Sequence, residues 1–176
     1  MNRLTNQLLT MDLQLFDFIY TKKRSAFLNY LMSWITHLGG AVFTVVLPCL
    51  FVILANSESD KVGYEALLVL LSSHLLVHII KRITNRSRPY KLLEDIEVLE
   101  IPFEEYSFPS GHTTASFSLA ITFSFYFPLF SVLFLSLALL VGISRIYLGV
   151  HYPSDVIVGI IISVLFSSII HLLLTL

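Results

Sequence analysis

The sequence predicts an all-α fold, an integral-membrane helical bundle. Hydrophobic residues make up 56% of the 176-residue chain and charged residues only 13%, whereas soluble domains carry about 25% charged residues. The apolar runs are spread along the whole chain and lack the alternation of a membrane barrel, and helices satisfy their own backbone hydrogen bonds in lipid. No stretch is left for a separate soluble domain, so we expect one domain, residues 1–176.

Residues 4–20 predict an amphipathic helix that lies at the membrane interface. Apolar side chains recur near helical spacing, Asp12 and Asp17 lie off that pattern, and cations follow at 22–24. The apolar positions are Leu4, Leu8, Leu9, Leu13, Phe16 and Ile19 or Tyr20. Because the two aspartates interrupt the apolar core that a signal peptide needs, we expect residues 1–24 to be retained as an interfacial helix.

Five later segments are predicted to cross the hydrocarbon core, for which about 20 residues suffice. The first, 26–55, is interrupted by Gly39-Gly40 and by Pro48, so we expect one crossing with a break. The others run over residues 62–83, 113–127, 129–148 and 154–176. A split at Gly39-Gly40, or a crossing by residues 4–20, would give six transmembrane helices.

Residues 84–108 predict a loop outside the hydrocarbon. Its charged residues are Arg86, Arg88, Lys91, Glu94, Asp95, Glu97, Glu100, Glu104 and Glu105. The acidic part, 94–105, is expected to be a solvated loop, with a lid or a headgroup selector over a site as the alternative. With five crossings, this loop, the 149–153 turn and the N-terminal helix share one membrane face.

Three polar stretches converge at that face: KRITNRSRP (81–89), PSGH (109–112) and SRIYLGVHYPSD (144–155). Taken singly, each has a structural explanation, since cations at helix ends extend to the headgroups and PSGH can begin a helix. Taken together, they match the needs of a phosphate monoester. Its phosphorus must be held in line and its oxygens stabilised.

The cations and the PSGH stretch could form a phosphate cradle. Lys81, Arg88 and Arg145 have no adjacent carboxylate to pair each one, and the arginine fork suits phosphate. Ser110 and Gly111 precede an apolar helix, so backbone N–H groups there can point at an anion.

Two histidines could supply the chemistry. His151 lies four residues before Asp155, close enough for the carboxylate to accept from one ring nitrogen and leave the other free to attack phosphorus. His112 can protonate the departing alkoxide.

These motifs resemble the three signatures of the type 2 phosphatidic acid phosphatase superfamily. The matching residues, in the same order and without a departure, are Lys81-x6-Arg88-Pro89, Pro109-Ser110-Gly111-His112 and Ser144-Arg145-x5-His151-x3-Asp155. The resemblance implies that His151 forms a phosphohistidine, Asp155 orients it, and His112 acts as acid and then as base for water. It also implies that Lys81, Arg88, Ser110, Gly111 and Arg145 bind the phosphoryl oxygens, with no metal and no cofactor.

The resemblance implies a metal-independent phosphatase of membrane lipid phosphates. Phosphatidate, phosphatidylglycerophosphate and polyprenyl or undecaprenyl diphosphate are all compatible substrates. The expected partners are this lipid and the bilayer. The net charge of −1 gives no field for nucleic acid, and no obligatory protein partner is inferred. The expected location is the bacterial inner membrane, as a multi-pass protein.

Two other functions could use the same residues. A vanadate-dependent haloperoxidase-like enzyme would share the anion cradle, although such enzymes are soluble and much larger. A non-catalytic phospholipid-binding or transport protein would use the same cations but has no need of the spacing between His151 and Asp155.

Two further features have more than one interpretation. All Lys and Arg except Lys61 fall on the face of the site, which by the positive-inside rule is cytoplasmic, whereas the resemblance implies the outer face. His74 and His78 share a helix face with Lys81 and are expected to line the bundle interior, with a metal pair as the weaker alternative.

Overall fold

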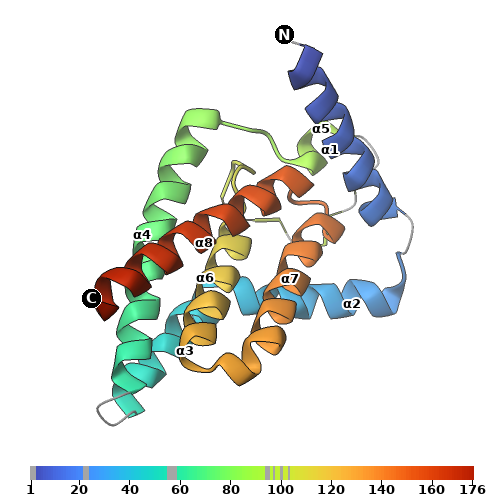
Figure 1. The fold of residues 1–176 in the computed structure, drawn as a ribbon. Coiled ribbons are helices and arrows are strands. Elements are labelled where there is room, and N and C mark those ends of the chain that lie inside the picture. The colour runs from blue at the N-terminus through green and yellow to red at the C-terminus, as the bar shows by residue number, and fades with distance from the viewer. Residues whose placement is uncertain are drawn as a thin grey trace.

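The computed structural model describes residues 3–21, 24–54, 59–93, 96, 98–99, 101–102 and 104–176, and every regular element in these residues is helical. The elements are α1 (Arg3–Thr21), α2 (Ala26–Ile35), the 3-10 helix η1 (Thr36–Gly39), α3 (Ala41–Leu54), α4 (Ser59–Thr84), α5 (Pro89–Leu92), α6 (Gly111–Tyr126), the 3-10 helix η2 (Pro128–Phe130), α7 (Ser131–Tyr147) and α8 (Pro153–Thr175) (Figure 1). The predicted all-α class is confirmed, and the predicted segments end within a few residues of these helices.

The described helices make this a multi-pass membrane protein. By length and composition, three segments could each cross a membrane, Lys61–Leu92, Pro128–Tyr147 and Pro153–Thr175. The pair α2 and α3, bent by 48° at its junction, adds a fourth if both halves form one span. A fifth crossing would have to be α6, which has 16 residues.

Helix α6 is the centre of the bundle and packs against α4, α7 and α8 (Figure 1). Hydroxyl side chains occupy these contacts. Ser163 Oγ on α8 donates to the Thr114 carbonyl at 2.8 Å, and the hydroxyls of Ser73 on α4 and Ser118 lie 3.4 Å apart. Small side chains let helix backbones approach closely, and hydrogen bonds join helices where lipid gives no hydrophobic drive. The first turn of α6 is thereby held firmly in place.

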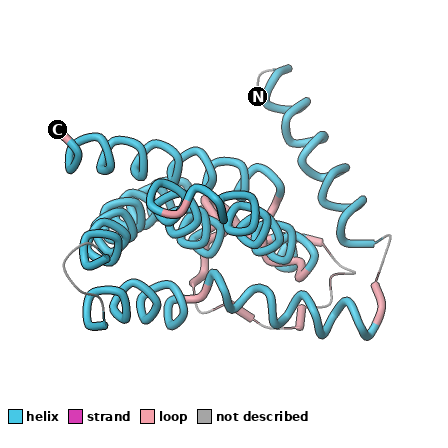
Figure 2. The backbone as a smooth tube through the Cα atoms, turned by 60° about the horizontal axis from the view of Figure 1, so that its bottom comes forward, coloured by secondary structure: helices cyan, strands magenta, loops and turns pink. Residues whose placement is uncertain are grey.

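The predicted break at Gly39-Gly40 is present and lies against the middle of the bundle. Figure 2 shows α2 and α3 running end to end along one side, with η1 between them. A Cβ on Gly39 would lie 2.7 Å from the His112 carbonyl oxygen and 2.7 Å from a Val141 methyl. Because that distance excludes any side chain, Gly39 allows η1 to reach the start of α6.

Pro48 was predicted to interrupt the same segment, and that prediction is wrong. Pro48 lies buried inside α3, which continues to Leu54. A Cβ on Gly63 of α4 would lie 2.6 Å from the Pro48 carbonyl oxygen, so the two backbones touch there. Proline is tolerated inside membrane helices where a neighbouring helix covers the altered backbone.

Helix α1 covers the residues predicted to form the N-terminal helix, and part of it packs against the bundle. Phe16 and Tyr20 are buried against Tyr152, with Phe16 and Tyr20 stacked at 5.5 Å between ring centroids. Asp12 lies on that buried face, whereas Leu9 and Leu13 are exposed. The buried part of α1 packs on Tyr152 and on the partly buried Arg86, whereas Leu9 and Leu13 are not covered by protein, so their predicted place at the membrane interface stays a prediction. Leu4 and Leu8 lie outside the side chains that the structure describes.

A polar cluster at the C-terminal end of α6 joins α4, α6 and α8. Glu65 of α4 is fully buried. Tyr126 Oη of α6 donates to Glu65 Oε2 at 2.6 Å, and His171 Nδ1 of α8 lies 3.0 Å from Glu65 Oε1. Buried carboxylates are costly without partners, so this cluster stabilises the association of the helices.

Substituting Tyr126→Phe should lower the stability of the protein in detergent. The variant leaves Glu65 without one donor, which costs about 1–2 kcal/mol and lowers the melting temperature. The control is Tyr64→Phe, a neighbouring tyrosine whose side chain is exposed. An equal shift in both variants would show that the Glu65 cluster does not hold the helices together.

Candidate active site

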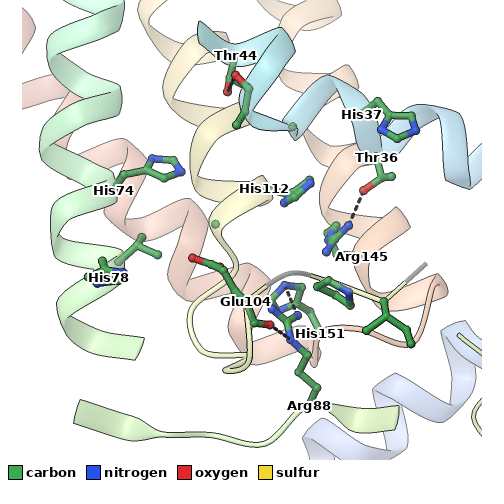
Figure 3. Close-up of a pocket in the computed structure, with 16 residues that line it drawn as sticks. Thr36, His37, Thr44, His74, His78, Arg88, Glu104, His112, Arg145 and His151 are labelled. Atoms are coloured by element: carbon green, nitrogen blue, oxygen red, sulfur yellow. Dashed lines mark hydrogen bonds between the residues drawn. The ribbon is translucent and has the colours of Figure 1, made fainter. Parts of the chain in front are cut away.

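A cavity of about 650 Å³ lies where η1, the first turn of α6, the end of α7 and the loop before α6 meet (Figure 3). Among the predicted site residues, those that line it are Arg88, Gly111, His112, Arg145 and His151. The first-motif arginine, the PSGH stretch and the third motif thus come together, although they are far apart in the sequence.

His151 lies in the turn between α7 and α8 and is almost fully buried. Its Nδ1 donates to Asp155 Oδ2 at 3.2 Å, because an ionised carboxylate can only accept. Arg88 Nη1 donates to His151 Nε2 at 3.1 Å. Together the two contacts select the tautomer that carries a lone pair on Nε2, the nitrogen that faces the cavity cations.

The surroundings of His151 also keep its ring neutral. Burial first, and then the positive charges of Arg88 and Arg145, hold the pKa of the His151 imidazole well below its ordinary value of 6.5. A neutral imidazole at physiological pH retains the lone pair that a nucleophile requires.

Asp155, in the first turn of α8, is fully buried behind His151. Besides the histidine, its Oδ2 accepts from the Tyr152 backbone N–H at 2.9 Å. Its backbone carbonyl accepts from the Ser110 N–H at 3.0 Å. The third motif is therefore bonded directly to the PSGH stretch.

The two cavity arginines are oriented by backbone carbonyls and by a threonine hydroxyl. Arg88 is buried, and it donates to the carbonyl oxygens of Val150 at 2.9 Å and Glu104 at 3.0 Å. Arg145 Nη1 donates to Thr36 Oγ1 of η1 at 2.8 Å. Figure 3 shows His112 and His151 beside the Arg145 guanidinium. These contacts direct both cations toward the same space.

Lys81 was expected to have no carboxylate partner, but the structure gives it one. Its Nζ lies 3.0 Å from Glu104 Oε2 and donates to the Tyr106 carbonyl at 2.9 Å. Lys81 lines a neighbouring cavity of about 460 Å³, and His78 and Glu104 line both cavities. The expectation failed because Glu104 lies on a distant loop segment that the fold brings back to α4.

Ser110 stabilises the start of α6 and does not line the cavity. It is the N-cap of α6, where its Oγ accepts from the Thr113 N–H at 3.5 Å and from Thr113 Oγ1 at 2.9 Å. It is fully buried. Gly111 and His112, and not Ser110, are the PSGH residues that line the cavity.

The acidic loop and the histidine pair can also be placed. Ile101, Pro102 and Glu104 line the cavity, so this part of the loop lies at the site, where Ile101 and Glu104 stay exposed to solvent. Glu94, Asp95, Glu97 and Glu100 lie outside the described residues. His74 and His78 both line the cavity, but His78 is exposed and does not lie in the bundle interior, where it was expected. Within the described part of the chain, no group of three potential metal ligands includes them.

Sequence reasoning missed four residues that the fold brings to this region, namely Asp12, Thr36, Arg86 and Glu104. Asp12 and Arg86 bond to each other and to the residues around Asp155. Only Arg86 carried a signal, since it lies within the first motif. Ordinary charged residues on a helix and a loop do not otherwise reveal distant partners.

Known proteins resemble this chain in both sequence and structure. A profile described as the PAP2 superfamily matches residues 63–175. Phosphatidylglycerophosphatase B of Bacillus subtilis is 34% identical over 151 residues, which cover 77% of this chain and 70% of that protein. The crystal structure of LpxE from Aquifex aeolicus superposes with a TM-score of 0.79 and 30% identity, covering 91% of this chain and 94% of that one.

A lipid A 1-phosphatase of Rhizobium johnstonii is 34% identical over 110 residues, which cover 60% of this chain and 45% of that protein. This chain thus spans about half the length of some of the relatives that it matches.

Substituting Glu104→Gln should strengthen binding of an oxyanion at the cavity. The Glu104 carboxylate pairs with Lys81 and therefore competes with an anion for that cation. Because Glu104 is half-exposed, we expect roughly a three- to tenfold tighter dissociation constant for orthovanadate, measured by titration calorimetry.

The matched control is Glu105→Gln, since Glu105 is the next residue and pairs with the exposed Lys91 at 3.5 Å. It should leave vanadate affinity unchanged. Equal tightening in both variants would indicate a general charge effect, and weaker binding in Glu104→Gln would place Glu104 among the groups that hold the ligand.

Proposed function

Because this chain belongs to the PAP2 superfamily, we propose that it is a phosphatase that hydrolyses membrane lipid phosphates through a phosphohistidine intermediate on His151. The observation that carries the proposal is the state of His151. Its Nδ1 is bonded to a buried carboxylate, and its Nε2 faces Arg88 at 3.1 Å in a cationic cavity. Such a lone pair, with guanidinium groups around it, suits attack on phosphorus.

The first half of the reaction transfers the phosphoryl group to the enzyme. His151 Nε2 attacks phosphorus, a P–N bond forms, and the bond from phosphorus to the lipid oxygen breaks. His112 gives its proton to the departing oxygen. The Asp155 carboxylate stabilises the positive charge that develops on the His151 ring and fixes the orientation of the ring.

The second half returns the enzyme to its starting state. His112, now neutral, takes a proton from water, the hydroxide attacks phosphorus, and the P–N bond breaks to release inorganic phosphate. Arg88, Arg145 and the Gly111 N–H stabilise the phosphoryl oxygens in both steps. Lys81, which pairs with Glu104 at 3.0 Å, adds its positive charge, and Ser110 holds the start of α6 in place.

Lipids fit the space around the cavity. An apolar hollow of about 330 Å³ lies between α3, α6 and α7, lined by Leu47, Phe123 and Phe134 among others. Thr44, one helical turn before Leu47 on α3, lines the catalytic cavity. A phosphate in the cavity therefore places apolar chains along α3. The names of the relatives, a phosphatidylglycerophosphatase and a lipid A 1-phosphatase, support lipid substrates.

A lipid panel tests the activity directly. Purified protein should release inorganic phosphate from one or more of phosphatidate, phosphatidylglycerophosphate and undecaprenyl diphosphate, with chelator present. His151→Ala should reduce this rate by at least about a thousandfold, because it removes the nucleophile. The matched control is His171→Gln in the Glu65 cluster, which should remain active.

The outcomes separate the proposed reaction from its rivals. An acid-labile phosphoenzyme that disappears in His151→Ala supports the mechanism. Full activity of that variant would exclude it. Binding of lipid phosphate without turnover would indicate a carrier, and halide oxidation that depends on vanadate would indicate the haloperoxidase-like alternative.

The proposed topology has five crossings: α2 with α3, then α4, α6, α7 and α8, in the bacterial inner membrane. Helix α6 is about 24 Å long at 1.5 Å per residue, less than the roughly 30 Å hydrocarbon core. It tolerates this length because its neighbours cover most of its surface. Residues 1–24 lie at the interface, and residues 84–108 lie on the side of the site, all within one domain.

The catalytic cavity is proposed to face the outside of the cell. A cysteine at Glu105, in a Cys49→Ala background, should then react with a membrane-impermeant maleimide in intact cells. Glu105 is exposed, so the residue itself is accessible. A cysteine at Lys61, at the start of α4, should react only after the cells are opened. The opposite pattern would place the cavity in the cytoplasm, as the distribution of lysine and arginine predicts.

A further inference from the structure

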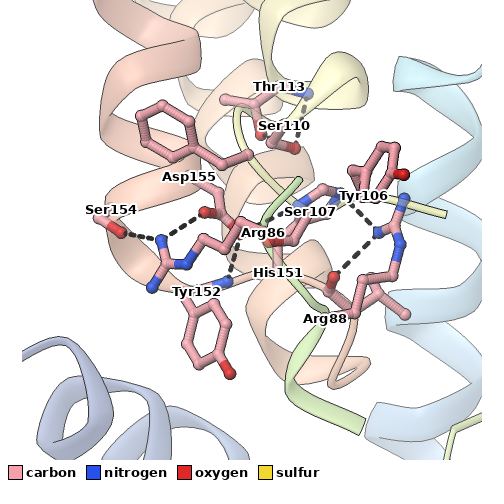
Figure 4. A network of polar contacts seen from close by, with 12 residues as sticks. Arg86, Arg88, Tyr106, Ser107, Ser110, Thr113, His151, Tyr152, Ser154 and Asp155 are labelled. Carbon is pink, nitrogen blue, oxygen red and sulfur yellow. Dashed lines mark hydrogen bonds and ion pairs between the residues drawn. The ribbon is translucent and has the colours of Figure 1, made fainter. Parts of the chain in front are cut away.

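Arg86 lies between the first-motif residues Lys81 and Arg88, yet its side chain points away from the phosphate cavity toward Asp155 (Figure 4). Its Nη1 donates to Asp155 Oδ1 at 2.7 Å and to Ser154 Oγ at 2.7 Å. Its Cζ lies 4.1 Å from the centroid of the Tyr152 ring. The guanidinium therefore contacts three of the four residues that follow His151, namely Tyr152, Ser154 and Asp155.

Asp12 of α1 closes the other side of this network. Asp12 Oδ2 accepts from Arg86 Nη2 at 2.6 Å and from Ser154 Oγ at 2.6 Å. Asp12 Oδ1 accepts from the Ser154 N–H at 2.9 Å. The carboxylate is nine-tenths buried, so it is shielded from water where it meets the arginine.

The charges explain why an arginine occupies this position. Asp12 and Asp155 place two buried carboxylates beside one guanidinium. Only a planar fork can donate to two carboxylates in different directions while its face lies on an aromatic ring, and lysine offers a single point of charge. Removing Arg86 would leave Asp155 Oδ1 without this donor and two carboxylates without their shared counter-charge.

Arg86 influences the orientation of His151 through Asp155, which bonds to both residues. Oδ2 of Asp155 accepts from His151 Nδ1, and Oδ1 accepts from Arg86. The two oxygens belong to one rigid carboxylate plane, so the donor on Oδ1 sets the direction in which Oδ2 presents itself to the histidine. Asp12 in turn sets the position of the Arg86 fork.

From this geometry we propose that Arg86 and Asp12 are positioning residues for the nucleophile, and that helix α1 thereby contributes to catalysis. This inference rests on the proposed function, because it assumes that His151 attacks phosphorus. Neither residue lines the catalytic cavity, so neither touches the substrate. Their effect appears in the rate of transfer to His151 and not in the affinity for the lipid phosphate.

The test compares steady-state and single-turnover kinetics of the full chain in detergent, on whichever panel lipid the wild type hydrolyses. Arg86→Gln should lower kcat and the rate of phosphohistidine formation by about 10–100-fold, the range seen when supporting partners of a reactive group are removed. KM should stay within about twofold of the wild type. Arg86→Lys should recover only part of the loss, because it restores the charge without the fork.

Asp12→Asn should lower the same rate by a smaller factor. The double variant Asp12→Asn with Arg86→Gln should be no slower than Arg86→Gln alone, because both residues belong to one connected network of bonds that acts on Asp155 through Arg86. The charge control is Asp17→Asn, an exposed carboxylate on the same helix, which should leave kcat unchanged.

A second control separates positioning from simple attachment of α1. Phe16→Ala removes apolar contact between α1 and Tyr152 without altering the ion pairs. It should lower the melting temperature while phosphohistidine formation, measured well below that temperature, stays close to wild type. If Phe16→Ala slows this step as much as Arg86→Gln does, the network serves only to attach α1, and the inference is wrong.

Other results would also overturn the inference. These are wild-type kcat in Arg86→Gln, a loss confined to KM, or losses that multiply in the double variant. In each case the wild type still forms phosphohistidine, so the proposed function stands. Absence of phosphate release by the wild type would instead contradict the proposed function itself.

Discussion

The buried Asp155 is the residue on which the site depends. Its carboxylate accepts from His151, from the Tyr152 N–H and from Arg86, while its backbone carbonyl accepts from the Ser110 N–H. One residue thus joins all three polar stretches. A buried carboxylate is stable only when donors and counter-charges surround it, so each of these contacts is both a structural requirement and a means of orienting the histidine.

The central position of α6 gives these contacts a rigid support. The PSGH stretch leads into its first turn, with Ser110 as the N-cap and with η1 close by at Gly39. Its last residue, Tyr126, bonds to the buried Glu65. Polar bonds therefore fix both ends of the helix. The hydroxyl contacts along its length hold it against α4 and α8, so the cavity is built on packed helices and not on loops alone.

The charges around the cavity favour binding of an anion, although one of the cations, Lys81, already has a carboxylate partner. Arg88 and Arg145 are directed by carbonyl and hydroxyl acceptors, which orient a guanidinium while leaving its charge in place. Lys81 is paired with Glu104, a half-exposed carboxylate at the boundary between two cavities. Burial first, and then the same positive charges, lower the pKa of the His151 imidazole, so the groups that attract phosphate also help to keep the nucleophile neutral.

The sequence by itself determined the helices and the reactive pair. Apolar run length predicts a membrane helix without knowledge of its neighbours, and the four-residue spacing of His151 and Asp155 brings them together across the start of α8. Only the tertiary structure decided that Asp12 and Arg86 support Asp155, that Thr36 orients Arg145 and that Glu104 pairs with Lys81. Pro48 belongs with these, since helix packing set its surroundings. The reason is physical: local spacing fixes contacts within one helix, whereas partners on different helices are chosen by how buried charges are satisfied when the bundle closes.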